Sequence, residues 1–255
     1  MIDFQDYSDN YTAQYKNQSF ETILVQVRRQ QVLSSLQKYP HHRILEIGCG
    51  LEPLFPFCSS FKHFTVVEPS VAFAQHAAEL AQGRANVNVI HGTFEDVYQE
   101  MIESANFDFI VLSSLLHEVV DPAALLRTIH AVCNESTVTH INVPNVYSFH
   151  RLLAYEMGIV KSIFEPSATE QKFQRHTRYN QEQLFKTIAT HGFKVLSSGS
   201  YFVKPFTHEQ MEKILQTGII DSAVITGLEK MTKYMPDLGC EIFANVQKEK
   251  EESLN

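Results

Sequence analysis

The sequence lacks several features that would assign it to common protein classes. It has no C-x-x-C pair, and its cysteines are too few and too scattered for a zinc site or a disulfide scaffold. No apolar run approaches the roughly 18 residues that span a bilayer, and the polar, acidic residues 1–18 differ from a secretory signal. We therefore expect a soluble protein in the reducing cytoplasm, with no membrane contact and no metal ion. The four cysteines are Cys49, Cys58, Cys133 and Cys240.

An excess of basic residues is missing as well. The 255-residue chain has 21 lysines and arginines against 29 aspartates and glutamates, a formal net charge of -8. It thus lacks the global basic footprint of a nucleic-acid-binding protein, and we expect no nucleic-acid partner. Apolar residues form 44% of the chain, which is enough to bury a core. Without repeats or a clear linker, we expect an N-terminal cap segment and helix over residues 1–40, followed by one domain over residues 41–255.

The sequence does contain a regular alternation of short apolar strands and helices. Ser70 and Asp121 are typical helix N-caps, and Pro122 suits the first position of a helix. Repeated strand–helix units predict an α/β fold with a mostly parallel sheet and right-handed crossovers. Ligands of such sheets bind beyond the carboxyl ends of the strands. The strands are expected over residues 43–49, 63–69, 86–92, 107–114 and 137–144.

After residue 144 the alternation breaks, and two stretches are predicted to be insertions. Residues 145–179 are expected to form a helix over 148–164 and then a loop. A second, helical insertion is expected at about 206–238, with helices over 208–216 and 221–234. The remaining elements are a helix over 180–192, a strand over 193–203 and a last strand over 240–248.

The first strand ends in a glycine turn. Gly48 and Gly50 allow a sharp backbone turn and the close approach of a ligand. Glu68 stands at the end of the next strand, 20 residues after Gly48, which is the spacing expected for a carboxylate that binds ribose hydroxyls. The pattern predicts a ligand that contains a nucleoside. The alternative is a plain tight turn of an α/β protein.

Two glutamates flank this turn and discriminate between nucleoside cofactors. Glu46 precedes the glycines and Glu52 follows them, and Pro53 takes the place of the third glycine of a dinucleotide fingerprint. Carboxylates would repel the pyrophosphate of a dinucleotide. S-adenosylmethionine (SAM) has no phosphate, and its sulfonium and ammonium groups are cationic, so acids beside the turn favour SAM. For Glu52 the alternative is a role in the first turn of a following helix.

These motifs resemble those of class I SAM-dependent methyltransferases. "ILEIGCG" followed by "VVEP" is similar to the first motif and its partner acid, and "VIHGTFEDV" resembles the segment that contacts adenine. "FDFIVLSSLLHEVVDP" resembles the fourth-strand motif of small-molecule methyltransferases. "VPNVYSFHRLLAYEMG" and "HTRYNQEQLFKTIATHGFKVL" are similar to the region after the core in a branch with sugar and natural-product methyltransferases. The resemblance covers roughly residues 43–203.

The resemblance implies a Rossmann-like class I methyltransferase fold, with seven mostly parallel strands, the last antiparallel, and helices on both faces. It also implies SAM as cofactor and S-adenosylhomocysteine (SAH) as product. Tyr11 lies in a polar segment with Tyr7 and Tyr15 that we expect to close over the cofactor, the alternative being a disordered tail. The expected cofactor-binding residues are Glu46, Gly48, Cys49, Gly50, Glu68, Pro69, Thr93, Phe94, Ser113 and Tyr11.

Two departures from the family pattern affect the expected roles. Glu52 replaces the third glycine of acid-x-G-x-G-x-G, and His117-Glu118 stands where many relatives carry Glu-His. We expect His117 to be the general base, because it follows the fourth strand and its ordinary pKa suits proton transfer near neutrality. The alternative is a histidine that packs or caps near the next helix.

The insertion at 145–179 is the expected acceptor lid. It carries five basic residues against three acidic ones in an acidic chain, so a small polar, anionic acceptor such as a sugar or sugar nucleotide would fit. A solvated helix face explains the same charges. We expect methyl transfer to oxygen or nitrogen by a monomer or homodimer. The expected acceptor-binding residues are His150, Arg151, His176, Arg178 and Tyr179.

Two other functions are compatible with parts of this pattern. One is a non-catalytic protein that keeps the methyltransferase fold as an interaction module, against which the intact Gly48, Gly50 and Glu68 argue. The other is an NAD(P)-dependent oxidoreductase, against which the missing third glycine and the flanking acids argue.

Overall fold

The fold comes from a computed structural model, which describes residues 8–9, 12, 19–102, 106–166 and 177–250. Its strands are β1 (Arg43–Ile47), β2 (His63–Glu68), β3 (Val87–His91), β4 (Phe109–Ser113), β5 (Val138–Pro144), β6 (Phe193–Tyr201) and β7 (Glu241–Lys248). The helices are α2 (Ser19–Leu36), α3 (Val71–Leu80), α4 (Phe94–Ile102), α5 (Pro122–Val132), α6 (Phe149–Glu156), α8 (Gln181–Thr190), α9 (His208–Gln216) and α10 (Ser222–Lys230). Two 3₁₀ turns complete the described elements, η1 (Phe55–Phe57) and η2 (Met231–Lys233).

The seven strands form one mixed sheet in the order β3-β2-β1-β4-β5-β7-β6. β1 to β5 pair in parallel, and β7 pairs antiparallel with both β5 and β6. The strand order reverses between β1 and β4, which places the glycine turn at the switch point of the sheet. The predicted fold class is confirmed, including the antiparallel last strand.

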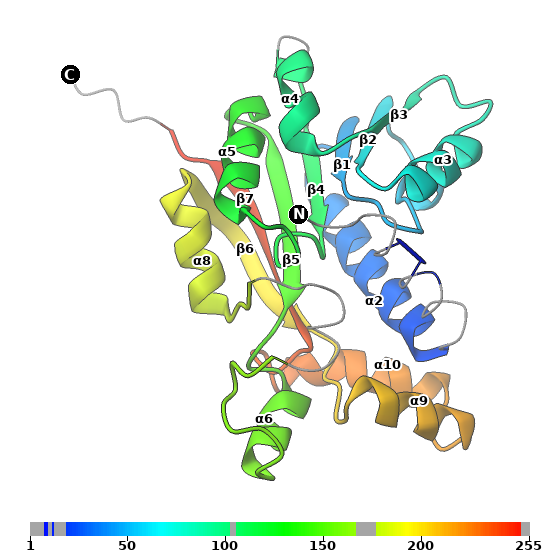
Figure 1. The fold of residues 1–255 in the computed structure, drawn as a ribbon, viewed down its shortest axis with the longest axis vertical. Helices are drawn as coiled ribbons and strands as arrows, with labels where there is room; N and C mark the ends of the chain where they lie inside the picture. Colours follow the sequence, from blue (N-terminus) through cyan, green and yellow to red (C-terminus); the bar gives the residue numbers. More distant parts are fainter. Residues whose placement is uncertain (1–7, 10–11, 13–18, 103–105, 167–176, 251–255) are drawn as a thin grey trace.

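Helices cover both faces of the sheet (Figure 1). α4, α5 and α8 lie on one face, and α2 and α3 lie on the other. β4 shows why both faces need cover, because Ile110 and Leu112 join one apolar cluster while Phe109 and Val111 join the other. Within the described parts of the chain, no helix combines the length and the apolar character needed to cross a bilayer.

α2 connects the sheet to the helices that precede β7. Its second half packs Val32 and Leu36 against the sheet. Its first turn packs Phe20 in a separate apolar cluster with Phe202 and with Met211 of α9. The helix is therefore fixed at both ends, and Figure 1 shows it running from the sheet to α9 and α10.

The structure differs from the sequence-based expectation in the lengths of three helical segments. α6 ends at Glu156 instead of continuing to residue 164, because Gly158 adopts a φ of 72° and Ile159 N donates to Ala154 O in a Schellman motif. The helix expected to follow the glycine turn is only the short η1. The helix expected over 221–234 is α10 followed by η2.

Candidate active site

A cavity of about 680 Å³ lies at the carboxyl ends of β1, β2 and β4. This is the edge at which open α/β sheets bind ligands, and the volume is typical of a small-molecule site. The predicted residues that line it come from four segments that are separate in the sequence. The predicted residues that line it are Glu46, Gly48, Cys49, Gly50, Glu68, Pro69, Thr93, Phe94 and Ser113. The tenth, Tyr11, is outside the described residues.

The glycine turn adopts a backbone conformation that few other residues tolerate. Gly48 has a φ of 71° and Gly50 a φ of 58°, both in the left-handed region. A Cβ on Gly48 would also lie 2.9 Å from Cδ2 of Leu115, whereas a Cβ on Gly50 would meet no atom within 4 Å. Gly48 is therefore constrained by both conformation and space, and Gly50 by conformation alone.

Glu68 is oriented by the backbone on either side of it. Its Oε2 accepts a hydrogen bond from Gly50 N at 3.0 Å, and its Oε1 accepts one from Ser70 N at 2.9 Å. The side chain is buried, and burial raises the pKa of Glu68. A carboxylate offers about four lone-pair sites. The two backbone bonds fix this group and leave acceptor capacity for the hydroxyls of a ribose.

Glu46 is buried beside Glu68 on the same edge. It is 5% exposed, and its Oε2 accepts a hydrogen bond from Leu54 N at 2.9 Å. Burial raises the pKa of Glu46 to about 8, and the charge of Glu68 acts in the same direction. A cation placed next to this carboxyl would reverse the effect, because an opposite charge favours the ionised form. The site thus suits a cationic ligand group.

Glu52 lines the cavity and is paired with α2. Its carboxylate forms an ion pair with Arg29, with 2.5 Å between Oε2 and Nη1. The guanidinium of Arg29 also lies 3.7 Å from the ring centroid of Phe57. This contact fastens α2 to the loop that follows the glycine turn.

One face of α2 forms a wall of the cavity, which the sequence analysis missed. The residues of this face recur at intervals of three or four, as one side of a helix requires. The signal is present in the sequence as charged residues spaced with valines along the predicted N-terminal helix. The wall consists of Glu21, Val25, Arg28, Arg29 and Val32.

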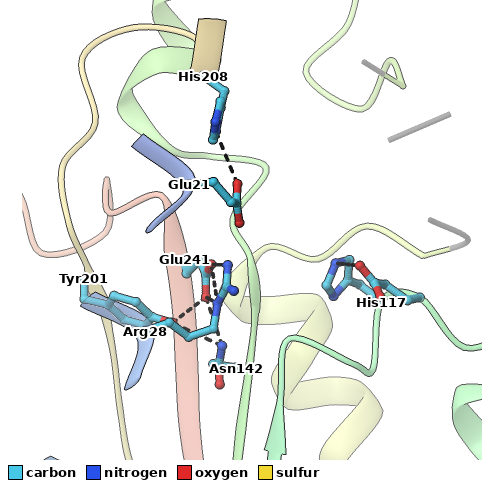
Figure 2. A network of polar contacts seen from close by, with 8 residues as sticks. Glu21, Arg28, His117, Asn142, Tyr201, His208 and Glu241 are labelled. Atoms are coloured by element: carbon cyan, nitrogen blue, oxygen red, sulfur yellow. Dashed lines mark hydrogen bonds and ion pairs between the residues drawn. The ribbon is translucent and has the colours of Figure 1, made fainter. Parts of the chain in front are cut away.

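Behind this wall, a buried polar cluster joins α2 to β5, β6 and β7 (Figure 2). Arg28 donates from Nε to both carboxylate oxygens of Glu241, at 3.0 and 3.2 Å. The hydroxyl of Tyr201 donates to Glu241, and Asn142 Nδ2 donates to it at 2.9 Å. Burial alone would raise the pKa of Glu241, but the Arg28 charge and these hydrogen bonds hold it at about 2. Glu241 is therefore a fixed anion of the fold.

The predicted base, His117, lies behind a neighbouring carboxylate. Its side chain is buried and does not line the cavity, whereas Glu118 does. Nε2 of His117 lies 3.4 Å from Oε1 of Glu118, an approach that is available because residues 116–118 form a turn. The structure thus presents a carboxylate to the ligand, with an imidazole next to it.

The predicted acceptor residues lie away from the cavity. Of the four that the structure describes, His150, Arg151, Arg178 and Tyr179, none lines it; His176 is outside the described residues. Arg151 donates to the carbonyls of Ile163 and Glu165 and so holds the chain that follows α6. Tyr179 is buried, and its carbonyl accepts from Val146 N.

Comparison with known proteins identifies a family. The family described as a methyltransferase domain matches residues 21–198, more than two thirds of the chain and all the predicted cofactor residues described here. The match begins in α2, so the part of the helix that forms the cavity wall lies within the matched residues. No curated protein matches the chain.

Solved structures share the fold at low sequence identity. A SAM-dependent methyltransferase from Thermotoga maritima is 16% identical with a TM-score of 0.62, and the match covers 96% of this chain and 99% of that one. The plantazolicin methyltransferase BamL, solved with a triazolic desmethylPZN analog and SAH, is 15% identical with a TM-score of 0.57, and the match covers 94% of this chain and 90% of that one. The [4+2]-cyclase SpnF is 18% identical with a TM-score of 0.55, covering 88% and 80%.

Proposed function

The chain belongs to the family of methyltransferase domains and is a SAM-dependent methyltransferase, and we propose that its acceptor is a small polar molecule that is methylated on nitrogen or oxygen in the cavity beside the glycine turn. The observation that supports this assignment of the site is the convergence of four segments on one cavity, with Glu68 held by Gly50 and Ser70 at its edge. A plain tight turn would not require a buried acid there.

Each described residue of the proposed site has a distinct task. Glu68 accepts from the ribose hydroxyls, and Thr93 and Phe94 contact the adenine. Glu46 faces the cationic end of the ligand, and the positive φ of Gly48 and Gly50 lets the backbone approach it. The bound cofactor supplies an electrophilic methyl group on a sulfonium. The protein's contribution is alignment of the acceptor and exclusion of water.

The anionic acceptor expected from the sequence has less support. That expectation depended on basic residues between positions 145 and 179, and none of those the structure describes lines the cavity. We therefore propose a polar acceptor without a phosphate.

Calorimetry and thermal shift test the proposal directly. SAM and SAH should bind at one site per chain and raise the melting temperature, since a ligand at 100 times its Kd stabilises the folded state by about 2.7 kcal/mol. NAD(H) and NADP(H) should have no effect. Stabilisation by a nicotinamide dinucleotide with SAM and SAH inert would contradict the proposal. Absence of SAM and SAH binding at high concentration would instead favour an interaction module.

A further inference from the structure

A residue with a strained backbone lies at the cavity, directly after β4. Among the described residues other than glycine, positive φ angles occur at Ser60 (70°), Ser114 (57°) and Phe202 (58°). The left-handed region is unfavourable for a residue with a Cβ, and residues held there cluster at functional sites. Of these three described residues, only Ser114 lines the cavity. We therefore asked which of its contacts require a serine.

The packing around Ser114 explains the turn but not the side chain. Ser114 N donates to Asn142 O of β5 at 3.0 Å. Cδ2 of Leu115 lies 2.9 Å from the position that a Cβ on Gly48 would take, and Leu116 is fully buried in the core. Because two consecutive leucines are both covered here, the chain must leave the alternation of a strand. Glycine would make this turn without strain.

The hydroxyl of Ser114 is available to a ligand. Within the described parts of the chain it has no hydrogen-bond partner, although the residue is half-buried and lines the cavity. The hydroxyls of Ser70 and Ser200, in contrast, accept from the backbone amides of Phe73 and Gly239, at 3.4 and 2.9 Å. A serine hydroxyl has one donor and two acceptor sites. All three are free at Ser114 for a group that enters the cavity.

The order of the strands places Ser114 at the end of the cavity that is left for the acceptor. The predicted adenine contacts follow β3, Glu68 ends β2, and the glycine turn follows β1, so the proposed cofactor residues run along the sheet from β3 to β1. β4 is the next strand, and Ser114 is bonded on its far side to β5. An acceptor must be aligned with the methyl group on the side away from the nucleoside. Ser114 lies on that side.

Aliphatic side chains form much of the cavity wall. They come from α2, from the glycine loop and from the segment after β4, as in other small-molecule sites with few polar groups on hydrophobic walls. A strongly hydrated sugar would leave many hydroxyls without partners against these side chains. An acceptor with one polar group and an apolar body fits better. The residues concerned are Val25, Val32, Leu54, Leu115 and Val119.

We propose that Ser114 binds the methyl acceptor, whose hydroxyl or amino group donates a hydrogen bond to Ser114 Oγ while its apolar body lies on the aliphatic wall. The inference rests on the proposed methyltransferase function. This hydrogen bond leaves a lone pair of the acceptor free to form the bond to the methyl carbon. The carbon–sulfur bond breaks with its electron pair on sulfur, and one proton passes to water. The products are SAH and a methyl ether or an N-methylamine.

Matched probes test the hydrogen bond. Phenylethanol and its methyl ether share one apolar body, hexanol and its methyl ether share another, and only the alcohols have a hydrogen to donate. Each probe is titrated into the SAH-bound protein, and its Kd is measured by ligand-observed NMR. We expect each alcohol to bind about fivefold more tightly than its ether, which corresponds to one neutral hydrogen bond.

Two substitutions separate the hydroxyl from the turn. Ser114→Ala and Ser114→Gly both remove the hydroxyl, but only glycine relieves the strain, so Ser114→Gly should melt about 2–4 °C above Ser114→Ala. In both variants the advantage of each alcohol should fall to within about twofold, and SAH affinity should stay within about twofold of the wild type. A loss of preference in the more stable variant cannot come from a weakened fold.

Ser60 provides the matched control. It has the same kind of backbone strain, but it is exposed and lies outside the described cavity lining. Ser60→Gly should melt above Ser60→Ala for the same reason, and both variants should keep the wild-type preference for the alcohols.

Each outcome bears on one of the two proposals. If SAH binds but no alcohol binds more tightly than its ether, the inference on Ser114 is overturned and the methyltransferase stands. The inference is also overturned if the preference persists in both Ser114 variants, or if these variants lose SAH affinity while the preference remains. If SAH does not bind to the wild type, the proposed function fails, and the inference fails with it.

Discussion

Two buried carboxyl groups of this protein lie in opposite electrostatic surroundings. Glu241 meets a guanidinium, a phenol and an amide, and its pKa is held at about 2. Glu46 is similarly buried, but its hydrogen bond within the described structure comes from the backbone of Leu54, and its pKa is raised to about 8. One acid is neutralised within the protein, whereas the other is not.

The difference separates a structural role from a binding role. The ionised form of Glu241 is fully compensated, so that it can hold α2 against β7. The ionised form of Glu46 becomes favourable only when a cation binds next to it. In the free protein, ionisation of this buried carboxyl is unfavourable. Perturbed acids in a cavity are often functional for this reason. The following three predictions test this contrast in order of decreasing effect.

Glu241→Gln should give the largest change, a loss of about 3–5 kcal/mol in the free energy of unfolding, because it breaks an ion pair whose carboxylate is buried and leaves the partly buried Arg28 without the charge of Glu241. Urea unfolding at pH 7 measures it. The pKa of this acid is lowered on folding, so its contribution is present above about 4.5 and is lost as the pH falls towards about 2.

The paired replacement of Arg28→Met with Glu241→Leu is the matched control for this prediction. It removes both charges together, so it should cost less than Glu241→Gln alone. A single variant with wild-type stability would show that the cluster does not hold the fold.

Glu68→Ala should leave the fold intact and weaken SAM binding by about 1–3 kcal/mol, the usual value for hydrogen bonds to a charged group. The variant also removes the acceptor of the Gly50 and Ser70 amides, so urea unfolding is measured beside SAM binding. Calorimetry with SAM and SAH reports the loss, and Glu79→Gln on the exposed side of α3 serves as the control. Unchanged affinity would remove Glu68 from the cofactor site.

The pH dependence of SAM affinity should reveal Glu46. In the free protein this acid is mostly protonated below a pH of about 8, and a bound cation lowers its pKa, so binding releases a proton. SAM affinity should therefore rise from pH 6.5 to 8 by up to about tenfold per pH unit and then level off. Glu46→Gln should abolish that part of the slope. An equal slope in the variant would place the titrating group elsewhere.

The sequence predicted the fold and the grouping of the proposed cofactor residues at one edge of the sheet, for reasons that are local. Each strand is a short apolar run, and Gly48, Gly50 and Glu68 stand at fixed distances along a β-α-β unit. The cofactor residues fall within a few positions of strand ends, where the topology alone brings them together.

The opposite wall depends on long-range contacts that no short motif encodes. Arg28 meets Glu241 across 213 positions of sequence, and its pairing depends on how α2 crosses the sheet. His117 and Glu118 are neighbours in a turn, and only Glu118 lines the cavity. In a turn, no helical or strand periodicity indicates the direction in which a side chain points. The choice of His117 as the base depended on its position after β4, whereas the residue that lines the cavity is the adjacent Glu118.

The arrangement of α2 limits which of its residues can be substituted without loss of the fold. Neighbouring positions of one helix have separate roles, since Glu21 and Val25 line the cavity, whereas Phe20 packs against α9 and Arg28 is bound to the last strand. A substitution at a cavity-lining position changes the wall of the site, whereas a substitution at Phe20 or Arg28 puts folding at risk. An engineer who seeks a new acceptor therefore has permitted and forbidden positions that alternate along a single helix.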